Sequence, residues 1–597
     1  MLESQVPSKP EPVRLGGEFL EGHGIVAKFL PLRRLNDLYR KVWQPEGEHF
    51  EANLLAEMQI QYHVDAADVA RIPKSGPVVA VANHPFGILD GLLLAAILPG
   101  VRRDVKLITN YMVSELPELE EFCLFVDPFG GSAARNRKPL KEALNWLANG
   151  GMLAIFPAGE VSHWSPRRVH IEDPAWNDTA ARLIRLTDAT ALPMYFSGRN
   201  SVSFHALGLI HPALRTARLA HEFLKARGKT VNIKIGTPIP ASTLTDLSSG
   251  EATRYLRCRT YLLRNRGAGL KVHKVTQLLV PKKAQKPIAP ALPQDALIAD
   301  VAGLGADRCL TEDRECAVYC ASAHEIPSLI QEIGRLREVT FRAVGEGSGK
   351  ELDLDLFDDY YRHLFVWNKA RQELVGAYRV GDVREILNTR GLSGLYTNTL
   401  FEYDPRLFEA VGDAFELGRS FVRPEYQKQY APLLLLWKAI SRLVCDHPSH
   451  AVLFGAVSIS GEYSRISREF LVGFYGSRLR SALADYVHPR RSFRTRRLRR
   501  WEIRQLDDLL NSADALADTI ADVENDRKAI PVLLRQYVKV GGQLLGFNVD
   551  RDFSNVVDGL ILVDLRKTNS AILERYMGKA ATASFLAHHG VAADLEA

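Results

Sequence analysis

Residues 77–94 have the sequence PVVAVANHPFGILDGLLL, which predicts a strand that ends at a turn and leads straight into a helix. His84 lies at this junction, and Asp90 follows one to two helical turns later. A carboxylate in that position can hold one nitrogen of the imidazole ring and leave the other free to take a proton. The stretch therefore predicts an enzyme that activates a hydroxyl or an amine with an oriented general base.

Short apolar runs alternate with helical patterns through the first half of the chain. The strand candidates are residues 78–82, 105–109, 152–156, 192–196 and 231–235, and helical patterns cover 139–148 and 212–226. Alternation of this kind predicts an α/β domain with a largely parallel sheet.

A second, different domain follows a stretch rich in proline and lysine at residues 271–293. Beyond it, helical patterns at 326–337 and 431–444 and strand patterns at 374–380 and 451–457 show no repeat of the first half. We expect an N-terminal helical extension over 1–59, an α/β domain over 60–265, a linker over 266–320 and a second domain with a C-terminal extension over 321–597.

The composition is that of a water-soluble chain that forms a hydrophobic core. Of the 597 residues 46% are hydrophobic and 24% charged, and the net charge is +6. No stretch approaches the roughly 18 apolar residues that cross a bilayer, and the acidic N-terminus lacks the apolar segment of a signal peptide. Six cysteines in 597 residues give no disulfide framework, which suits a reducing cytoplasm, so we expect a cytoplasmic protein that lies on the inner face of the cytoplasmic membrane without crossing it.

Two further features of the composition bear on partners and metals. Seven of the eleven residues from Arg490 to Arg500 are arginine, a run that either docks an acidic partner or anionic lipid, or is simply a solvated surface. No nucleic-acid reader motif accompanies it, so no nucleic-acid partner is expected. Cys309, Cys316 and Cys320 match no compact metal signature, and no metal is expected there.

Four short motifs occur in a fixed order in the first half. They are Asn83-His84-Pro85-Phe86-Gly87-Ile88-Leu89-Asp90, then Phe125-Val126-Asp127-Pro128 with Arg135 after it, then Phe156-Pro157-Ala158-Gly159-Glu160, then Ala191-Leu192-Pro193-Met194. Over about residues 60–265 this set resembles the glycerophosphate and lysophospholipid acyltransferase family, in the variant often called hemolysin-like.

The resemblance implies roles for several residues. His84 would take the proton of an acceptor hydroxyl as its oxygen attacks an acyl thioester, and Asp90 would stabilise the imidazolium. Asn83, Arg135, Gly159 and Glu160 would lie at the substrate, with Arg135 and the backbone around Gly159 holding a polar headgroup.

Two departures from the family pattern weaken glycerol phosphate as the acceptor. Five residues separate His84 from Asp90, where the family has four, and Glu160 follows Gly159, where the family has Glu before Gly. Each of two residues also has a purely structural alternative. His84 could be a core or capping histidine, and Glu160 could be a carboxylate that caps a turn.

The second half carries a sparser constellation of charged groups. It comprises Arg337 and Phe341, then Glu351, Asp353, Asp355 and Asp358, then Val375-Gly376-Ala377-Tyr378-Arg379 and Phe415-Glu416-Leu417-Gly418-Arg419-Ser420-Phe421-Val422, and later Ile530 to Tyr537 with Asp552-Phe553. This order resembles the GNAT-like α+β N-acyltransferases that use acyl carrier protein, chiefly the ornithine N-acyltransferases and more distantly the acyl-homoserine-lactone synthases.

The second resemblance implies an N-acyl transfer from a thioester donor. Glu416 would be the base or the group that positions the amine, Arg419 would bind a carboxylate or organise the site, and Arg379 would contact the substrate. Residues 423–430 lack the glycines that cradle coenzyme A pyrophosphate, which favours acyl carrier protein over coenzyme A as donor. The alternatives are a structural ion pair between Glu416 and Arg419, and a solvated acidic face at Asp355 and Asp358.

The order of the two domains resembles the bifunctional ornithine lipid synthases. That resemblance implies N-acylation of an amino acid with a 3-hydroxyacyl group, and then O-acylation of the resulting lyso-lipid, with no bound cofactor, acyl carrier protein as partner and a membrane lipid as acceptor. Two other interpretations remain: a lysophospholipid acyltransferase with a degenerate GNAT domain, and a non-catalytic, membrane-active hemolysin-like protein.

Overall fold

The computed structural model describes residues 31–43, 50–110, 117–126, 133–165, 170–210, 212–267, 285–429, 431–494, 510, 512–524, 526, 528–551, 553 and 555–591. The chain divides into two compact units. The first comprises residues 1–268 and 499–527, and the second comprises 269–498 and 528–597.

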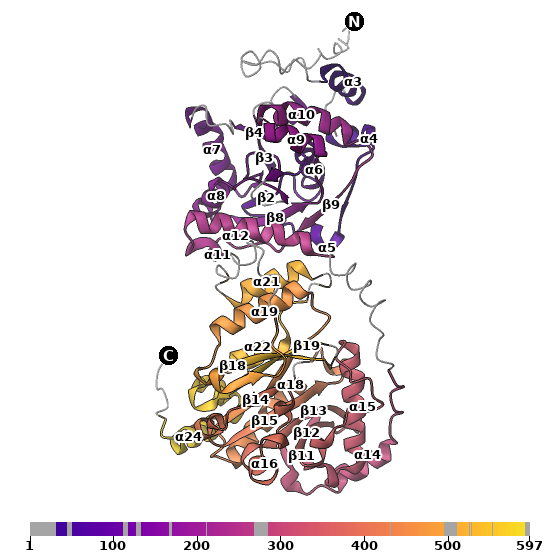
Figure 1. Ribbon diagram of the computed structural model, residues 1–597, viewed down its shortest axis with the longest axis vertical. Coiled ribbons are helices and arrows are strands. Elements are labelled where there is room, and N and C mark those ends of the chain that lie inside the picture. The colour runs from indigo at the N-terminus through magenta and orange to yellow at the C-terminus, as the bar shows by residue number, and fades with distance from the viewer. Residues whose placement is uncertain are drawn as a thin grey trace. The chain divides into compact units, whose positions relative to one another are not determined.

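The first unit is a parallel sheet between helices. Its described strands are β1 (Gln61–Val64), β2 (Val78–Ala82), β3 (Val105–Asn110), β4 (Cys123–Val126), β5 (Met152–Ile155), β8 (Thr190–Phe196) and β9 (Thr230–Ile235), in the sheet order β1-β9-β8-β2-β5-β3-β4. Figure 1 labels β2, β3, β4, β8 and β9 of this sheet. Every pair of neighbouring strands is parallel except β8 and β9. The predicted largely parallel sheet is confirmed.

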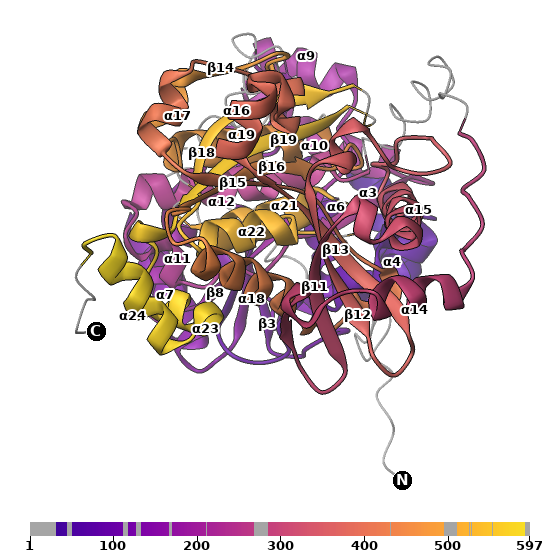
Figure 2. The same ribbon diagram turned by 90° about the horizontal axis from the view of Figure 1, so that it is seen from below.

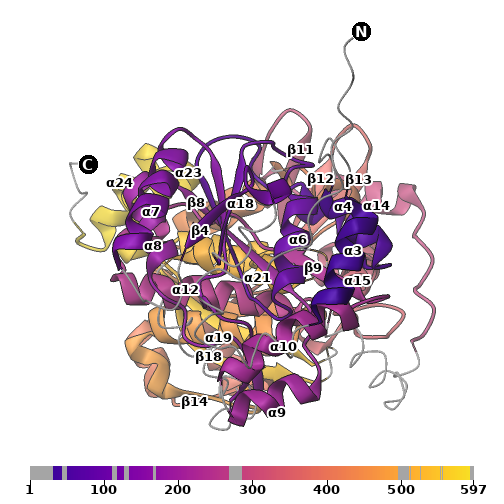
Figure 3. The same ribbon diagram turned by 90° about the horizontal axis from the view of Figure 1, so that it is seen from above.

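Helices cover both faces of this sheet. They are α3 (Leu32–Val42), α4 (Phe50–Glu57), α5 (Ala66–Val69), α6 (Ile88–Ile97), α7 (Ala133–Ala148), α8 (Thr179–Thr187), α9 (Val202–Ile210), α10 (Pro212–Lys225), α11 (Ser242–Thr245), α12 (Ser249–Leu262) and α21 (Ala513–Val523). Figure 3 shows α7, α8 and α12 on one side of the strands and α3, α4 and α6 on the other. A small hairpin, β6 (His163–Ser165) with β7 (His170–Glu172), stands apart from the sheet.

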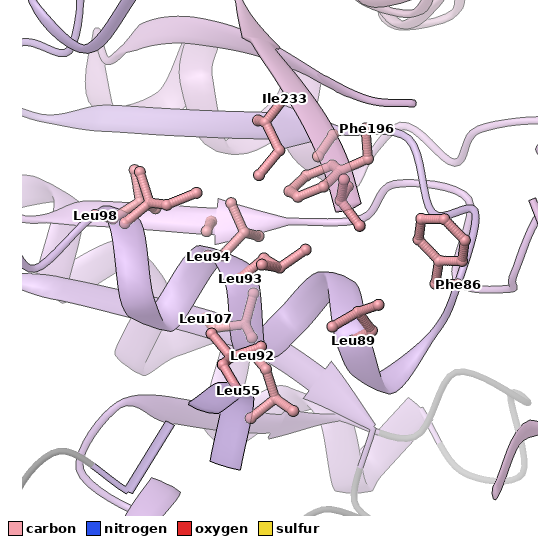
Figure 4. Packing of buried hydrophobic residues seen from close by; sticks show 14 of the residues in the cluster. Leu55, Phe86, Leu89, Leu92, Leu93, Leu94, Leu98, Leu107, Phe196 and Ile233 are labelled. Atoms are coloured by element: carbon pink, nitrogen blue, oxygen red, sulfur yellow. The ribbon is translucent and has the colours of Figure 1, made fainter. Parts of the chain in front are cut away.

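The core of the first unit lies between α6 and the sheet. Leu89 and Leu93 of α6 are buried against Phe196 and Ile233 of the strands (Figure 4). Burying a leucine or phenylalanine side chain contributes about 1.5–3 kcal/mol, so this face fixes where α6 begins. The start of α6 in turn positions the His84 turn.

The second unit is built on a mixed sheet. Its described strands run β10 (Cys309–Glu312), β11 (Cys316–Ser322), β12 (Arg362–Asn368), β13 (Glu373–Asp382), β15 (Ala414–Val422), β16 (Val452–Ile459), β19 (Val556–Asp564) and β18 (Gln543–Asp550) in spatial order. The pair β15 and β16 is parallel and the other neighbours are antiparallel. A separate ribbon pairs β14 (Phe401–Tyr403) with β17 (Val487–Pro489).

Helices flank this sheet as well. They are α14 (Gln294–Ala302), α15 (Pro327–Ala343), α16 (Val383–Arg390), α17 (Arg406–Val411), α18 (Ala431–Asp446), α19 (Arg465–Arg478), α22 (Val532–Lys539), α23 (Ser570–Met577) and α24 (Lys579–His588). Figure 2 shows α15 and α18 on opposite sides of β11, β12 and β13. The buried residues of α15 pack with Phe365 and Ala377 of these strands.

The division into units differs in two ways from the boundaries that the sequence suggests. Helix α14 and strand β10 lie where the sequence predicts a linker, because Leu297 is buried in the core under α15. Residues 499–527 belong to the first unit although they come late in the sequence. Composition marks the proline-rich stretch, but it carries no signal for a segment that returns to an earlier unit.

Candidate active sites

His84 lies at the carboxyl end of β2, in the turn before α6. Its ring Nδ1 is 3.0 Å from Asp90 Oδ2, and its side chain is 17% exposed. Its Nε2 makes no hydrogen bond to the described residues. With the proton of the neutral ring on Nδ1, the ring donates to Asp90 and Nε2 can accept a proton.

Asp90 is buried and holds the turn together. The same Oδ2 atom accepts the N–H groups of Phe86, at 2.8 Å, and Gly87, at 2.9 Å. Burial raises the pKa of the Asp90 carboxyl, while His84 and the two N–H groups act in the opposite direction. The extra residue between His84 and Asp90 is accommodated at Gly87, whose φ of 89° lies in the region that favours glycine.

The third motif supports His84 from one side. The Phe156 ring stacks on the imidazole with centroids 4.0 Å apart and planes 20° from parallel. Gly159, at φ 66°, turns the chain so that its N–H donates to the Phe156 carbonyl. Glu160 is partly exposed and lies 2.5 Å from the guanidinium of Arg215 on α10.

Asp173 is a part of this site that the motifs do not reveal. It is 1% exposed, and its Oδ1 accepts the backbone N–H of His84 at 3.2 Å and the Ser162 hydroxyl at 2.5 Å. Its Oδ2 accepts the indole N–H of Trp176 at 2.9 Å. Asp173 therefore holds the backbone of His84, whereas Asp90 holds its ring. A lone Asp after a short hairpin strand carries no spacing rule that would have singled it out.

Of two residues expected at the substrate, Asn83 has a structural role, and the side chain of Arg135 is not among those that the structure describes. Asn83 is 3% exposed, and its side-chain amide exchanges two hydrogen bonds with the backbone of Phe196, so it joins β2 to β8. Arg135 belongs to the first turn of α7, and its side chain lies outside the described residues.

In the second unit Glu416 is buried on β15 and 1% exposed. It accepts hydrogen bonds from the Tyr361 hydroxyl, from the Thr397 N–H at 2.6 Å and from the Tyr396 N–H at 3.2 Å. Burial raises the pKa of its carboxyl, although these donors favour the charged form. Glu416 thus ties the loop at Tyr396 to the strand.

The pairing of Glu416 with Arg419 that the sequence left open does not occur. Arg419 instead lies 3.3 Å from Asp353 and 3.4 Å from Asp355, and it donates to the Tyr396 hydroxyl at 2.9 Å. Its φ of 49° is a backbone conformation rare for a residue with a side chain. Opposite a register shift in β13, that conformation turns the guanidinium toward Asp353 rather than toward Glu416.

The solvated acidic face that was the alternative for Asp355 and Asp358 is also wrong. Asp358 is 3% exposed and lies 2.8 Å from Arg337 and 3.2 Å from Arg379, and Asp355 lies 2.5 Å from Arg379. The two arginines lower the pKa of Asp358, although burial opposes them. Arg379 is itself 1% exposed, so it organises this network from within the unit.

The strands β15 and β16 separate beside this network. They pair only over Ala414–Glu416 and Val452–Phe454, although both continue for several residues. A Cβ on Gly455 would clash with the Leu417 carbonyl oxygen, so only glycine fits at the first position beyond the paired residues. Beyond Glu416, the backbone of β15 is therefore not paired with β16, and this unpaired end of β15 carries Arg419.

A buried carboxyl on β19 lies close to Arg419. Asp558 stands opposite Ser458 and Asn548 in the register of the sheet, and the Ser458 hydroxyl donates to Glu346 at 2.8 Å. Asp558 is 6% exposed, and its Oδ2 makes no hydrogen bond to the described residues. Burial, together with Asp550 and Glu346, raises the pKa of Asp558 well above its usual range.

Other expected features are placed as follows. Arg490 lies 2.8 Å from Glu402, whereas Arg496, Arg497, Arg499 and Arg500 fall outside the described residues. Among the residues that the structure describes, no group of three or more His, Cys, Asp and Glu side chains is placed to hold a metal ion. Within the same residues, no helix has the length and apolarity needed to span a bilayer.

Comparison with known proteins agrees with this two-part architecture. Residues 28–269 match the family described as acyltransferase, and residues 336–437 match the acetyltransferase (GNAT) domain family. A glycine N(alpha)-acyltransferase of Bacteroides thetaiotaomicron is 34% identical over 186 residues, which are 28% of this chain and 55% of that protein. An L-ornithine N(alpha)-acyltransferase of Rhizobium meliloti is 25% identical over 251 residues, which are 40% of this chain and 76% of that protein.

These matches show that the chain has an acyltransferase domain and a GNAT domain, each on a sheet flanked by helices. It spans about half the length of the glycine N-acyltransferase. A lyso-glycine lipid O-acyltransferase of Bacteroides thetaiotaomicron is 30% identical over 190 residues, which are 30% of this chain and 67% of that protein. The chain belongs to the acyltransferase family of that protein.

Proposed function

We propose that this chain makes an amino-acid-containing lipid by two successive acyl transfers, as the bifunctional ornithine lipid synthases do. The C-terminal domain acylates the α-amine of an amino acid with a 3-hydroxyacyl group, and the N-terminal domain esterifies the 3-hydroxyl of the product. The observation that carries the proposal is that one chain resembles both a glycine N-acyltransferase and a lyso-glycine lipid O-acyltransferase. The two reactions are consecutive in chemistry, since the first supplies the hydroxyl that the second acylates.

For the O-transfer we propose His84 as general base and Asp90 as the group that orients it. His84 Nε2 takes the proton of the lyso-lipid hydroxyl as its oxygen attacks the thioester carbonyl. The tetrahedral intermediate then collapses, the C–S bond breaks, and the imidazolium returns its proton to the leaving thiolate. The 3.0 Å contact to Asp90 supports the imidazolium during this cycle.

A lyso-aminolipid also accounts for the changed third motif. Such an acceptor has no phosphate, and its amine can meet a carboxylate where a glycerol phosphate could not. Glu160 is the candidate, because its side chain is 46% exposed even with Arg215 beside it. Arg135 and Gly159 remain proposed contacts to the acceptor, while Asn83 would act by holding the strand ends together.

For the N-transfer we propose Glu416 as the group that takes the ammonium proton or positions the amine. The neutral amine then attacks the thioester carbonyl, and the thiol leaves with a proton. Burial raises the pKa of Glu416, which makes it a better proton acceptor near neutral pH. Arg419, and behind it Arg379, would bind the carboxylate of the amino acid or organise the site.

We propose acyl carrier protein as the donor and the membrane surface as the place of the second reaction. The segment before α18 has no glycine with which to cradle a pyrophosphate, and the arginines from Arg490 to Arg500 suit an acidic carrier. Acyl-coenzyme A is the alternative donor. Release of free thiol from each donor in turn separates the two.

Two acceptors are supported by different observations. Glycine is favoured by the higher identity of the glycine N-acyltransferase, 34% against 25% for the ornithine enzyme. Ornithine is favoured by the carboxyls of Asp558, whose Oδ2 makes no hydrogen bond to the described residues, and of Glu346, since both suit a second ammonium group. Competition between equal concentrations of the two amino acids in one assay decides between them.

Lipid profiles of a host that lacks amino lipids test the proposal as a whole. The wild type should make the diacylated amino lipid, His84→Ala should accumulate the mono-acylated lyso-lipid, and Glu416→Ala should make neither. Diacylated lipid from His84→Ala would contradict the N-terminal assignment. Mono-acylated lipid from Glu416→Ala at wild-type level would contradict the C-terminal one.

A further inference from the structure

Helix α21 comes from the second half of the sequence but is part of the first unit. Before it, the chain runs through β17 of the second unit, and after it the chain returns to α22 of that unit. Within the first unit α21 packs on α12 and on the turn Leu263–Asn265 that follows α12. The first unit therefore includes a helix that lies far from residues 1–268 in the sequence.

Asp522, near the end of α21, makes the contact. Its Oδ1 accepts the Arg71 guanidinium at 2.7 Å and both the N–H and the hydroxyl of Thr237, at 2.8 and 2.9 Å. Its Oδ2 accepts the Arg259 guanidinium of α12 at 2.8 Å. A Cβ on Gly236 would lie 3.1 Å from Asp522 Oδ2, so the end of β9 and the carboxylate are in close contact.

This contact is an ion network with little access to water. The Asp522 side chain is 0% exposed, and that of Arg259 is 1% exposed. Burial alone raises the pKa of Asp522, but Arg259 and Arg71 lower it below its ordinary value, so the carboxylate is charged. Arg266 adds a hydrogen bond to the Asp522 carbonyl and lies 2.6 Å from Asp68. Removing one partner from such a network leaves the remaining charges buried and uncompensated.

Helix α12 also supports the His84 site, through Arg257, which lies two residues before Arg259 on the same helix. Arg257 donates to the Asp173 carbonyl at 2.9 Å, and the Asp173 N–H donates to the Tyr261 hydroxyl at 2.8 Å. Asp173 in turn accepts the backbone N–H of His84. One continuous set of contacts thus runs from Asp522 through α12 and Asp173 to His84.

We propose that Asp522 is a positioning residue for O-acyl transfer: α21 holds α12, and α12 holds Asp173 and the backbone of His84. The inference rests on the proposed role of His84 as the base of this reaction. It assigns a residue from the C-terminal half of the chain to the reaction of the N-terminal domain. The N-acyl transfer, which uses the second unit, does not depend on it.

The main experiment compares Asp522→Asn with Asp514→Asn in the full-length protein. Asp514 lies on the same helix but is exposed, which makes it a matched control. O-acylation is measured with added lyso-ornithine and lyso-glycine lipids, and N-acylation with added amino acids. We expect kcat for O-acylation to fall by about tenfold or more in Asp522→Asn, with KM for the lyso-lipid and kcat for N-acylation within about twofold, because displacing a base from its acceptor costs rate rather than binding.

Amide hydrogen exchange supplies a second, direct measurement. Peptides that cover residues 231–240 and 249–262 should exchange faster in Asp522→Asn than in Asp514→Asn, because both segments lose a contact to α21. If Asp522→Asn is not recovered in folded form, Thr237→Val removes only the hydroxyl contact and should give the same pattern more weakly.

Three outcomes overturn the inference. They are O-acylation by Asp522→Asn within twofold of wild type, an equal loss of both activities, and unchanged exchange of both peptides. Including His84→Ala separates this result from the proposed function itself. O-acylation that survives in His84→Ala refutes the role of His84, whereas loss in His84→Ala with none in Asp522→Asn refutes only the role of α21.

Discussion

The substitution Asp90→Asn separates catalysis from stability at the His84 site. Asparagine has the shape of aspartate but no charge. Its single oxygen can take the place of Asp90 Oδ2 and still accept the N–H groups of Phe86 and Gly87, which lie 2.8 and 2.9 Å from that atom. The same oxygen also accepts the N–H at His84 Nδ1, which lies 3.0 Å away, so the ring tautomer is kept and the negative charge beside the ring is lost.

Without that charge, the imidazolium that forms when Nε2 takes the acceptor's proton is no longer stabilised by an ion pair. We therefore expect kcat for O-acylation to fall by about 100- to 1,000-fold, or roughly 2.7–4 kcal/mol of barrier. Stability should change little. Burial raises the pKa of Asp90, so the charged carboxylate carries a desolvation cost that asparagine removes, and this gain offsets the loss of charge on the three hydrogen bonds to within about 1–2 kcal/mol.

The assay is esterification of an added lyso-lipid by full-length protein, together with a thermal unfolding scan of the same preparation. Asp188→Asn is the matched control, because Asp188 is exposed at the end of α8 and its φ of 51° suits asparagine. A loss in kcat smaller than tenfold in Asp90→Asn would show that the charge of Asp90 does not stabilise the His84 imidazolium. Equal loss of N-acylation would show that the variant fails through its fold.

Three further substitutions have definite expected outcomes. Gly87→Ala should destabilise the first unit by about 2–4 kcal/mol in denaturant titration, because φ is 89° and the new methyl meets Leu219 at 3.1 Å and Val161 at 3.3 Å. Asp558→Asn should raise the unfolding temperature at pH 8 and lose this gain as the pH falls toward 4. Because burial raises the pKa of Asp558 in the folded protein, burying this carboxyl disfavours folding only at a pH where it is charged in the unfolded chain. A gain in unfolding temperature that grows toward acid pH would contradict this reasoning. Glu416→Gln should lower N-acylation by about 100-fold or more while O-acylation of added lyso-lipid stays within about twofold, and unchanged N-acylation in an amino-acid assay would exclude Glu416 as base.

The sequence predicted the strands of the first unit well because they are buried on both faces. The run Val78–Ala82 is buried throughout and corresponds to β2, and the other four strand candidates overlap described strands within two residues at either end. The edge strands β1 and β4 were missed. All but one of the side chains of β1 are exposed, so its sequence lacks the apolar pattern on which the prediction depends.

The candidate site was predictable only where its residues are neighbours in sequence. His84 and Asp90 share one turn, and a spacing rule finds them. Asp173 and Asp522 reach the same site through contacts 89 and 285 residues apart in the chain, to His84 and Thr237, and no local pattern encodes such contacts. In the second unit the sequence left a solvated face open as the alternative for the aspartates at 355 and 358, because their arginine partners come from other elements.

The backbone of β15 explains why Glu416 and Arg419 serve different parts of the second site. In a regular strand residues three apart point to opposite faces, so the two side chains would be separated in any case. The left-handed conformation of Arg419 adds a local twist, and its guanidinium lies between the rings of Tyr396 and Phe553, with its carbon 4.8 and 4.4 Å from their centroids. Tyr396 also donates its backbone N–H to Glu416. The loop residue Tyr396, rather than a direct ion pair, therefore couples the buried carboxylate to the arginine where β15 and β16 separate.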